Sequence, residues 1–166
     1  MPASAGMNTM AKAWKIPYLN ADQPLYICVR KILRTRFAEM ISYEEGTLAG
    51  EDIEYLHSMR VSSRRLQAVM KIFRGAFTGK KFRHEYAQLR TLIRALGVVR
   101  ELDVFIAKLE GYAKTMNERE IKALNLLIAR QKANRTKKRR ELVKTINTLN
   151  RIKYKENFEL FTETAV

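Results

Sequence analysis

The 166-residue sequence is poor in cysteine, histidine and proline, and each scarcity excludes a class of structure. Its one cysteine, Cys28, has no partner for an internal disulfide. Two histidines that lie far apart cannot complete the usual four-ligand Cys/His zinc site. We therefore expect no metal and no cofactor, and a reducing, cytoplasmic setting.

Long apolar runs are missing as well. A membrane-spanning helix needs about 20 consecutive apolar residues, whereas the longest pure apolar runs are short ones such as residues 95–99. The N-terminal segment has no long apolar stretch of the secretory kind. The sequence thus predicts that the chain is not an integral membrane protein.

Acidic residues are scarce in two long segments. The net charge is +15, and residues 57–100 and 130–155 each hold eleven Lys or Arg and a single acid, Glu85 or Glu141. Like charges concentrated in this way repel one another, and an acidic partner relieves the repulsion. Nucleic acid, an anionic membrane surface and a polyanion all satisfy the charge count alone.

The sequence does contain a clear helical pattern. All three prolines lie in the first 24 residues, and the glycines then divide the chain into expected helices near residues 24–44, 51–74, 80–112 and 117–152. Apolar side chains recur in these segments at helical spacing, and no strand pattern is found. We predict an all-α, up-down four-helix bundle of long antiparallel helices over residues 24–152. Residues 1–23 are expected to form a flexible or docked arm, and residues 153–166 a C-terminal tail.

The second expected helix separates an apolar face from a basic face. At about 100° per residue, one side collects the donors His57, Arg60, Arg64, Gln67 and Lys71, with Arg65 and Arg74 on its shoulders. Such a line is often only a solvated face, but solvated faces usually mix signs, and no acid lies between Glu54 and Glu85. Arginine also dominates here, and its planar fork donates bidentately to phosphate and carboxylate oxygens.

The third expected helix repeats this pattern, because Arg83, Arg90 and Arg94 share a face opposite its apolar stripe. Farther along the same helix, Arg100 and Asp103 share a side. Two interpretations of Asp103 remain open: an ordinary surface ion pair at i,i+3, or an acid that holds an arginine fork in position.

Two blocks on these helices resemble the CHAD family, the conserved-histidine α-helical domain. HSMRVSSRRL, which begins at His57, resembles the H-x-x-R-V-x-x-R-R-L signature, and LGVVRELDV, which begins at Leu96, resembles L-G-x-x-R-[DE]-x-D-V. The resemblance covers roughly residues 25–152. It implies a helical fold with a basic cavity that binds inorganic polyphosphate, often beside polyphosphate granules or fused to a triphosphate tunnel metalloenzyme domain, and a polyphosphate-metabolising enzyme as a partner.

The resemblance carries over residue by residue to His57, Arg60, Arg64, Arg65, Arg100 and Asp103, and less firmly to Arg94. Family members often have a basic residue where this chain has Gln67, and Glu101 stands where Asp is commoner. Family domains usually contain two pseudo-symmetric helical halves, and this chain has material for one lobe. We therefore expect a homodimer that rebuilds the two-lobed cavity, an arrangement that closed symmetry favours.

The fourth expected helix has polar residues in the middle of its apolar stripe. Gln131, Arg135 and Lys138 interrupt the stripe, so this section either faces the ligand cavity or extends past its neighbours. Glu118 to Lys122 spells E-x-E-x-K, a motif of triphosphate tunnel metalloenzymes, but those residues act on a strand, and here they open a helix. The KKRR run at 137–140 is a generic polyanion patch.

We interpret the chain as a non-enzymatic polyphosphate-binding module. A nucleic-acid-binding helical protein is the alternative, and the absence of aromatics on the two basic lines counts against it. No acidic cluster suited to Mg²⁺ is visible, so we expect no catalytic residue, and we expect no membrane partner. The predicted binding residues are His57, Arg60, Arg64, Arg65, Lys71, Arg90, Arg94, Arg100, Arg135 and Lys138, with Asp103 as orienting acid. Whether His57 contacts ligand or makes a fixed structural hydrogen bond is left open.

Overall fold

The computed structural model describes residues 12–166, which form a helical protein without strands over that range. The sequence prediction of an all-α fold is therefore confirmed. The helices are α1 (Leu25–Ile41), α2 (Glu44–Ala49), α3 (Ile53–Ile72), α4 (Gly79–Ala113), α5 (Glu118–Arg151) and α6 (Tyr154–Thr162), with a 3₁₀ turn at Arg74–Ala76.

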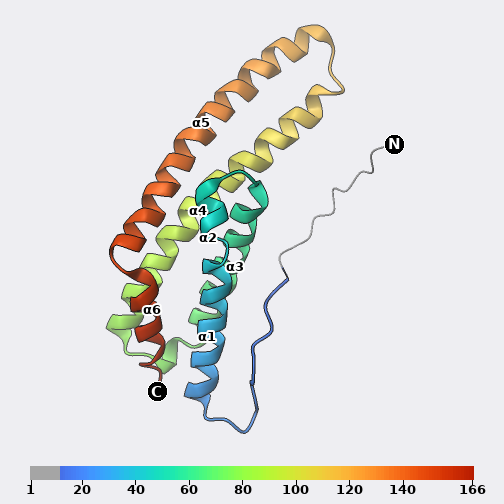
Figure 1. Ribbon diagram of the computed structural model, residues 1–166. Coiled ribbons are helices and arrows are strands. Elements are labelled where there is room, and N and C mark those ends of the chain that lie inside the picture. The colour runs from blue at the N-terminus through green and yellow to red at the C-terminus, as the bar shows by residue number, and fades with distance from the viewer. Residues whose placement is uncertain (1–11) are drawn as a thin grey trace.

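The long helices run in alternate directions and pack side by side (Figure 1). Helix α3 lies between α1 and α4, and α4 and α5 form an antiparallel hairpin. Short α6 packs back against α1, α4 and α5. The far halves of α4 and α5 project beyond α1 and α3, so the hairpin is longer than the rest of the bundle (Figure 1).

The four predicted long helices are present, but the prediction of only four is incomplete. Gly97 does not interrupt α4, because one helical glycine costs only about 1 kcal/mol and α4 runs unbroken through it. The sequence analysis missed α2 and placed a tail where α6 forms. Neither glycine nor proline marks the turn before α6; instead Lys153 adopts a left-handed conformation with φ of 55°.

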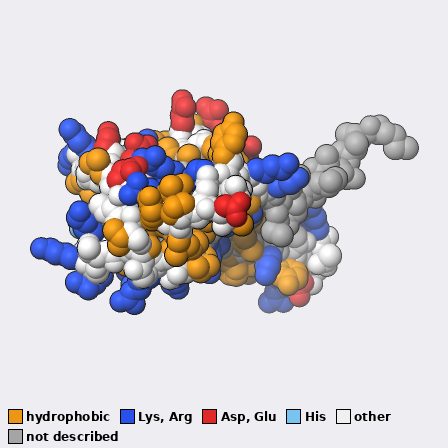
Figure 2. Space-filling view, turned by 90° about the horizontal axis from the view of Figure 1, so that it is seen from below, with side chains coloured by type: hydrophobic (Ala, Val, Ile, Leu, Met, Phe, Trp, Pro, Cys, Tyr) orange, Lys and Arg blue, Asp and Glu red, His pale blue; other side chains and the backbone are white. Residues whose placement is uncertain are grey.

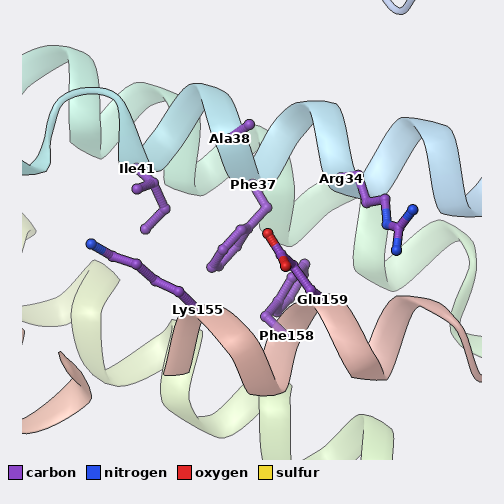
Figure 3. A pocket seen from close by; sticks show the side chains of 7 residues that line it. All are labelled: Arg34, Phe37, Ala38, Ile41, Lys155, Phe158 and Glu159. Atoms are coloured by element: carbon purple, nitrogen blue, oxygen red, sulfur yellow. The ribbon is translucent and has the colours of Figure 1, made fainter. Parts of the chain in front are cut away.

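The core explains why α6 belongs to the bundle. The rings of Phe37 in α1 and Phe158 in α6 stack with centroids 4.1 Å apart, and Phe161 stacks on Phe77 at 4.3 Å. All four side chains are buried. A pocket of about 520 Å³ lies between α1 and α6 beside the Phe37–Phe158 stack, where Arg34, Lys155 and Glu159 also line it (Figure 3), and none of the predicted site residues does.

Part of the predicted N-terminal arm lies against α1. Lys31 donates to the Tyr18 carbonyl at 2.6 Å, and Arg36 donates to the Trp14 carbonyl at 2.7 Å. Trp14 and Tyr18 of the predicted arm therefore contact α1 through their carbonyl groups, whereas residues 1–11 lie outside the described residues.

Candidate anion-binding pocket

The two motif blocks meet where α3 packs against α4. His57 and Arg60 of α3 line an open pocket of about 430 Å³ together with Arg100 of α4. A Cβ atom placed on Gly97 would lie 3.8 Å from Arg60 Nε, so the glycine of the second block packs directly against the arginine of the first. The structure thus brings together three of the predicted site residues.

His57 makes no hydrogen bond with the described residues, although both of its ring nitrogens are buried. Burial is the main cause that lowers its pKa, the positive charges of Arg100 and Arg60 lower it further, and Glu54 opposes them. His57 is therefore neutral at neutral pH in the unliganded protein, with a nitrogen donor and a nitrogen acceptor unused. Among residues 12–166 no fixed structural hydrogen bond of His57 is formed, and ligand contact by His57 stays a prediction.

Arg60 and Arg100 are also without a partner of opposite charge among residues 12–166. Arg60 Nε is buried and forms no hydrogen bond there. Glu101 lines the same pocket, but it forms no ion pair with either arginine. Buried polar groups are normally satisfied, so this pocket has hydrogen-bonding capacity that the described protein atoms do not use.

Asp103 orients an arginine, but a different one from its helical neighbour. Its side chain is only 2% exposed and accepts a hydrogen bond at 2.5 Å from Arg135 Nε of α5. The i,i+3 ion pair with Arg100 is not formed. Arg135 does not line the His57 pocket, and its position shows that the polar centre of α5 meets α4 through a buried acid.

Arg65 turns away from the pocket and toward α1. It donates to Glu39 Oε1 at 2.8 Å, and Arg36 donates to the other oxygen of the same carboxylate. Glu39 is fully buried. The sequence analysis missed this acid, although the i,i+3 spacing of Arg36 and Glu39 was a signal for it. Arg65 thus holds α3 to α1, a structural role that the family motif did not indicate.

The remaining predicted cations fall into two groups. Lys138 pairs with Glu141 of its own helix at 2.8 Å. Four others are exposed and form no ion pair with the described residues: Arg64, Lys71, Arg90 and Arg94. These four lie on the same two helices as the pocket and extend its positive charge toward the opposite end of the bundle.

The pocket also contains residues that the sequence analysis did not name. Lys108 lies two helical turns beyond Arg100, and Val104 lies between them, a spacing of four residues that places all three on one face. Phe105, 44% exposed, lines the pocket as well. The regular spacing from Arg100 could have identified Lys108, but the exposure of Phe105 depends on where α3 begins.

Residues 12–166 contain no group of three or more His, Cys, Asp or Glu side chains that could hold a metal ion. No helix of that part of the chain is long and apolar enough to span a membrane.

Comparison with known proteins gives one match. The model of the CHAD domain matches residues 31–162, which include α3, α4, α5 and α6. Comparisons with curated proteins and with solved structures found no significant match. Because the matched region spans most of the sequence and contains the two blocks that form the pocket, the chain belongs to the CHAD family.

Proposed function

We propose that this protein binds inorganic polyphosphate, without catalysing a reaction, at the pocket lined by His57, Arg60 and Arg100. The observation that carries the proposal is a contrast in ion pairing within residues 12–166. His57, Arg60 and Arg100 have no acidic partner there, whereas Arg65 and Arg135 each pair with a buried acid. Phosphate oxygens would supply the missing acceptors. Polyphosphate binding is also a general association of the CHAD family.

The exposed cations give the polymer a path beyond the pocket. Arg64 and Lys71 continue along α3, and the rise from Arg60 to Lys71 is about 16 Å at 1.5 Å per residue. Arg90 and Arg94 extend along α4. A polymer without bases offers only charge and oxygen acceptors, so rows of cations on rigid helices suit it. Its affinity should fall steeply with added salt, as it does when cations bind nucleic-acid phosphates.

Three predicted binding residues are assigned neither primary nor secondary phosphate contacts: Arg65, Arg135 and Lys138. Each already donates to a carboxylate, and a phosphate would have to compete with that acid. Asp103 then acts as an orienting acid for Arg135 at the edge of the hairpin. We assign primary phosphate contacts to the three pocket residues and secondary contacts to the exposed rows.

We further propose that a second copy of the chain completes the binding site. Val104 and Phe105 are about 40% and 44% exposed at the mouth of the pocket, and Tyr112 of the same helix is 60% exposed. A partner covering these side chains would also enclose the phosphate path. Light scattering should report a dimer, and a monomer that still binds polyphosphate would overturn this part. A polyphosphate-metabolising enzyme and polyphosphate granules in the cytoplasm are the proposed surroundings.

One observation favours the alternative of nucleic-acid binding. Phe105 places an exposed aromatic ring in the basic pocket, where a base could stack on it. The two functions predict different roles for this ring: stacking matters for single-stranded nucleic acid and not for a phosphate polymer.

The decisive experiment titrates the purified protein with long-chain polyphosphate, single-stranded DNA and double-stranded DNA at equal total charge and physiological salt. We expect polyphosphate to bind at least tenfold more tightly than either DNA. Comparable affinities would favour the alternative. Released phosphate is measured in the same samples with Mg²⁺ present, and its appearance would contradict a purely binding role.

A further inference from the structure

The first turn of α4 has an unusual distribution of charge. It begins Gly79-Lys80-Lys81, continues to Arg83 and His84, and has neither an acid nor a side-chain cap. The start of α3 is capped by Asp52, and that of α5 by Asn117 with Glu118 and Glu120. The positive end of a helix dipole disfavours cations, so the start of α4 has a surplus of positive potential that an anion would relieve.

A pocket adjoins this turn. Lys80, Lys81, His84 and Glu85 of α4 line it on one side, and α6 with the residues after it lines the other, enclosing about 610 Å³. Figure 2 looks onto this end of the bundle and shows Lys and Arg side chains along its edges, with Asp and Glu side chains between some of them. His84 is about 24 Å along α4 from Arg100, so this pocket is separate from the one at His57.

Glu85 is the unexpected member of the pocket. It is the single acid between His57 and Arg100 in the sequence, and only 6% of it is exposed. Its Oε2 atom is buried and has no hydrogen-bond partner among residues 12–166, while Oε1 lies 3.9 Å from His84 Nε2. A buried carboxyl oxygen without a partner is costly, so a ligand that brings a donor to this oxygen would be favoured.

The surroundings of Glu85 define that ligand further. Burial raises the pKa of Glu85, and His84 opposes this effect. From α6, the buried hydroxyl of Tyr154 is also without a partner in the described chain. Burial raises the pKa of Tyr154, the charge of Glu85 raises it further, and Tyr154 therefore stays protonated. Lys80 and Lys81 complete the charged groups that line the pocket. An anion that itself carries a proton would suit both the lysines and the Glu85 carboxylate.

We propose that this pocket binds a terminal phosphate group, with one proton shared between a phosphate oxygen and the carboxylate of Glu85. Lys80, Lys81 and His84 bind the remaining oxygens. Orthophosphate and phosphomonoesters carry such a proton because their second pKa lies near neutrality, at about 6 for phosphomonoesters. Sulfate, nucleic-acid phosphodiesters and the interior units of polyphosphate lack it. Glu85 thus selects a terminal phosphate from other anions, and the selection does not depend on polyphosphate binding at His57.

The test compares orthophosphate with sulfate at equal ionic strength near neutral pH, by calorimetry and by backbone amide shifts at the start of α4. We expect the wild-type protein to bind orthophosphate at least tenfold more tightly than sulfate. In Glu85→Gln, an amide can donate to either anion, so sulfate should bind more tightly and the preference should disappear. Equal binding of both anions by the wild type, or an unchanged preference in the variant, would overturn the proposal.

Two double variants show whether the anion binds at the start of α4 in a folded protein, and whether the His57 pocket contributes to that binding. Lys80→Gln with Lys81→Gln should weaken both anions by tenfold or more while helicity by circular dichroism is retained. In Arg60→Gln with Arg100→Gln, the backbone amide shifts that orthophosphate causes at the start of α4 should be retained, whatever binding is lost at the His57 pocket. If the first pair binds as the wild type does, or if the second pair loses those shifts, the pocket at α4 is not the site.

Further ligands in the Arg60→Gln/Arg100→Gln protein identify the source of the phosphate. Phenyl phosphate tests a phosphomonoester, and polyphosphates of different length at equal total phosphate test a chain end. Binding that follows the number of ends rather than the number of units would assign the site to chain ends of the polymer. Binding of orthophosphate alone would assign it to free phosphate, and both results support a terminal-phosphate site.

Discussion

Two arginine clusters flank α3, and they differ in one respect. On the side of α1, Arg36 and Arg65 share the fully buried carboxylate of Glu39. On the side of α4, Arg60 and Arg100 meet beside His57 with no acid paired to them in the described chain. Adjacent turns of one helix thus carry arginines with opposite roles. The presence or absence of a buried acid, rather than the arginine itself, separates the structural cluster from the proposed binding cluster.

The largest effect should follow removal of the acid from the structural cluster. Glu39→Gln leaves Arg36 and Arg65 partly buried without their counter-charge, and breaking a buried pair in this way costs about 3 kcal/mol in the free energy of unfolding. Urea denaturation measures the loss. Glu45→Gln removes an exposed acid nearby, and it should change the midpoint little. Equal effects of the two changes would show that burial of Glu39 does not matter.

The binding cluster should respond in the opposite way. Arg60→Gln with Arg100→Gln removes two cations that have no acid partner, so stability should be unchanged or slightly higher. Polyphosphate affinity should fall about a hundredfold, because charged hydrogen bonds contribute about 1.5–3 kcal/mol each. Fluorescence anisotropy with labelled polyphosphate measures the change.

A matched control for this pair is Arg119→Gln with Lys122→Gln, which removes the same charge from the exposed start of α5. If the control weakens binding as much as the pocket variant, net charge alone attracts the polymer. The two clusters would then differ in structure without differing in function.

Asp103 lies between the structural and the binding cluster in character, because its carboxylate holds Arg135 beside the proposed phosphate path. Asp103→Asn should lower the free energy of unfolding by about 2 kcal/mol, since Arg135 loses a charged hydrogen bond to a buried group. We expect a smaller effect on polyphosphate affinity than for the pocket pair. A loss of affinity as large as that of the pocket pair, with stability unchanged, would move Arg135 into the primary site.

His57 should produce the smallest effect, visible as a pH dependence. Its pKa is lowered in the folded protein, so its contribution to stability is complete above the unfolded value of 6.5 and is lost as pH falls below it. The wild type should lose more stability than His57→Gln between neutral pH and about pH 5. Bound phosphate favours the charged ring and should reduce that loss. Parallel pH profiles of the two proteins would contradict a buried neutral His57.

Helix periodicity was sufficient to predict the long helices and their basic faces, because both depend on residues close in sequence, whereas the pocket was an expectation from the resemblance to the CHAD family. His57, Arg60 and Arg100 lie on helix faces that follow from a rotation of about 100° per residue. The apolar spacing of Tyr154, Phe158 and Phe161 could also have predicted α6. That helix was missed because the turn before it is formed by Lys153, a residue that rarely adopts positive φ.

The acid with which each arginine pairs on another helix could not be predicted from helix periodicity. Arg64 and Arg65 are adjacent in the motif, yet one is exposed and the other reaches Glu39, which is 26 residues away in sequence. Asp103 likewise takes Arg135, which is 32 residues away, instead of Arg100. Such pairs depend on how two helices cross, and the crossing is set by packing of the whole core.

The length of the α4–α5 hairpin has a consequence for the order of folding. Its two helices are joined by a short turn with a capping box at Asn117, so their contacts close short loops at little entropic cost. The Phe37–Phe158 stack instead joins residues from nearly opposite ends of the chain. We therefore expect the hairpin to form early and α6 to dock on α1 in the last step. The phosphate pocket beside α6 would then assemble only after the pocket between α3 and α4.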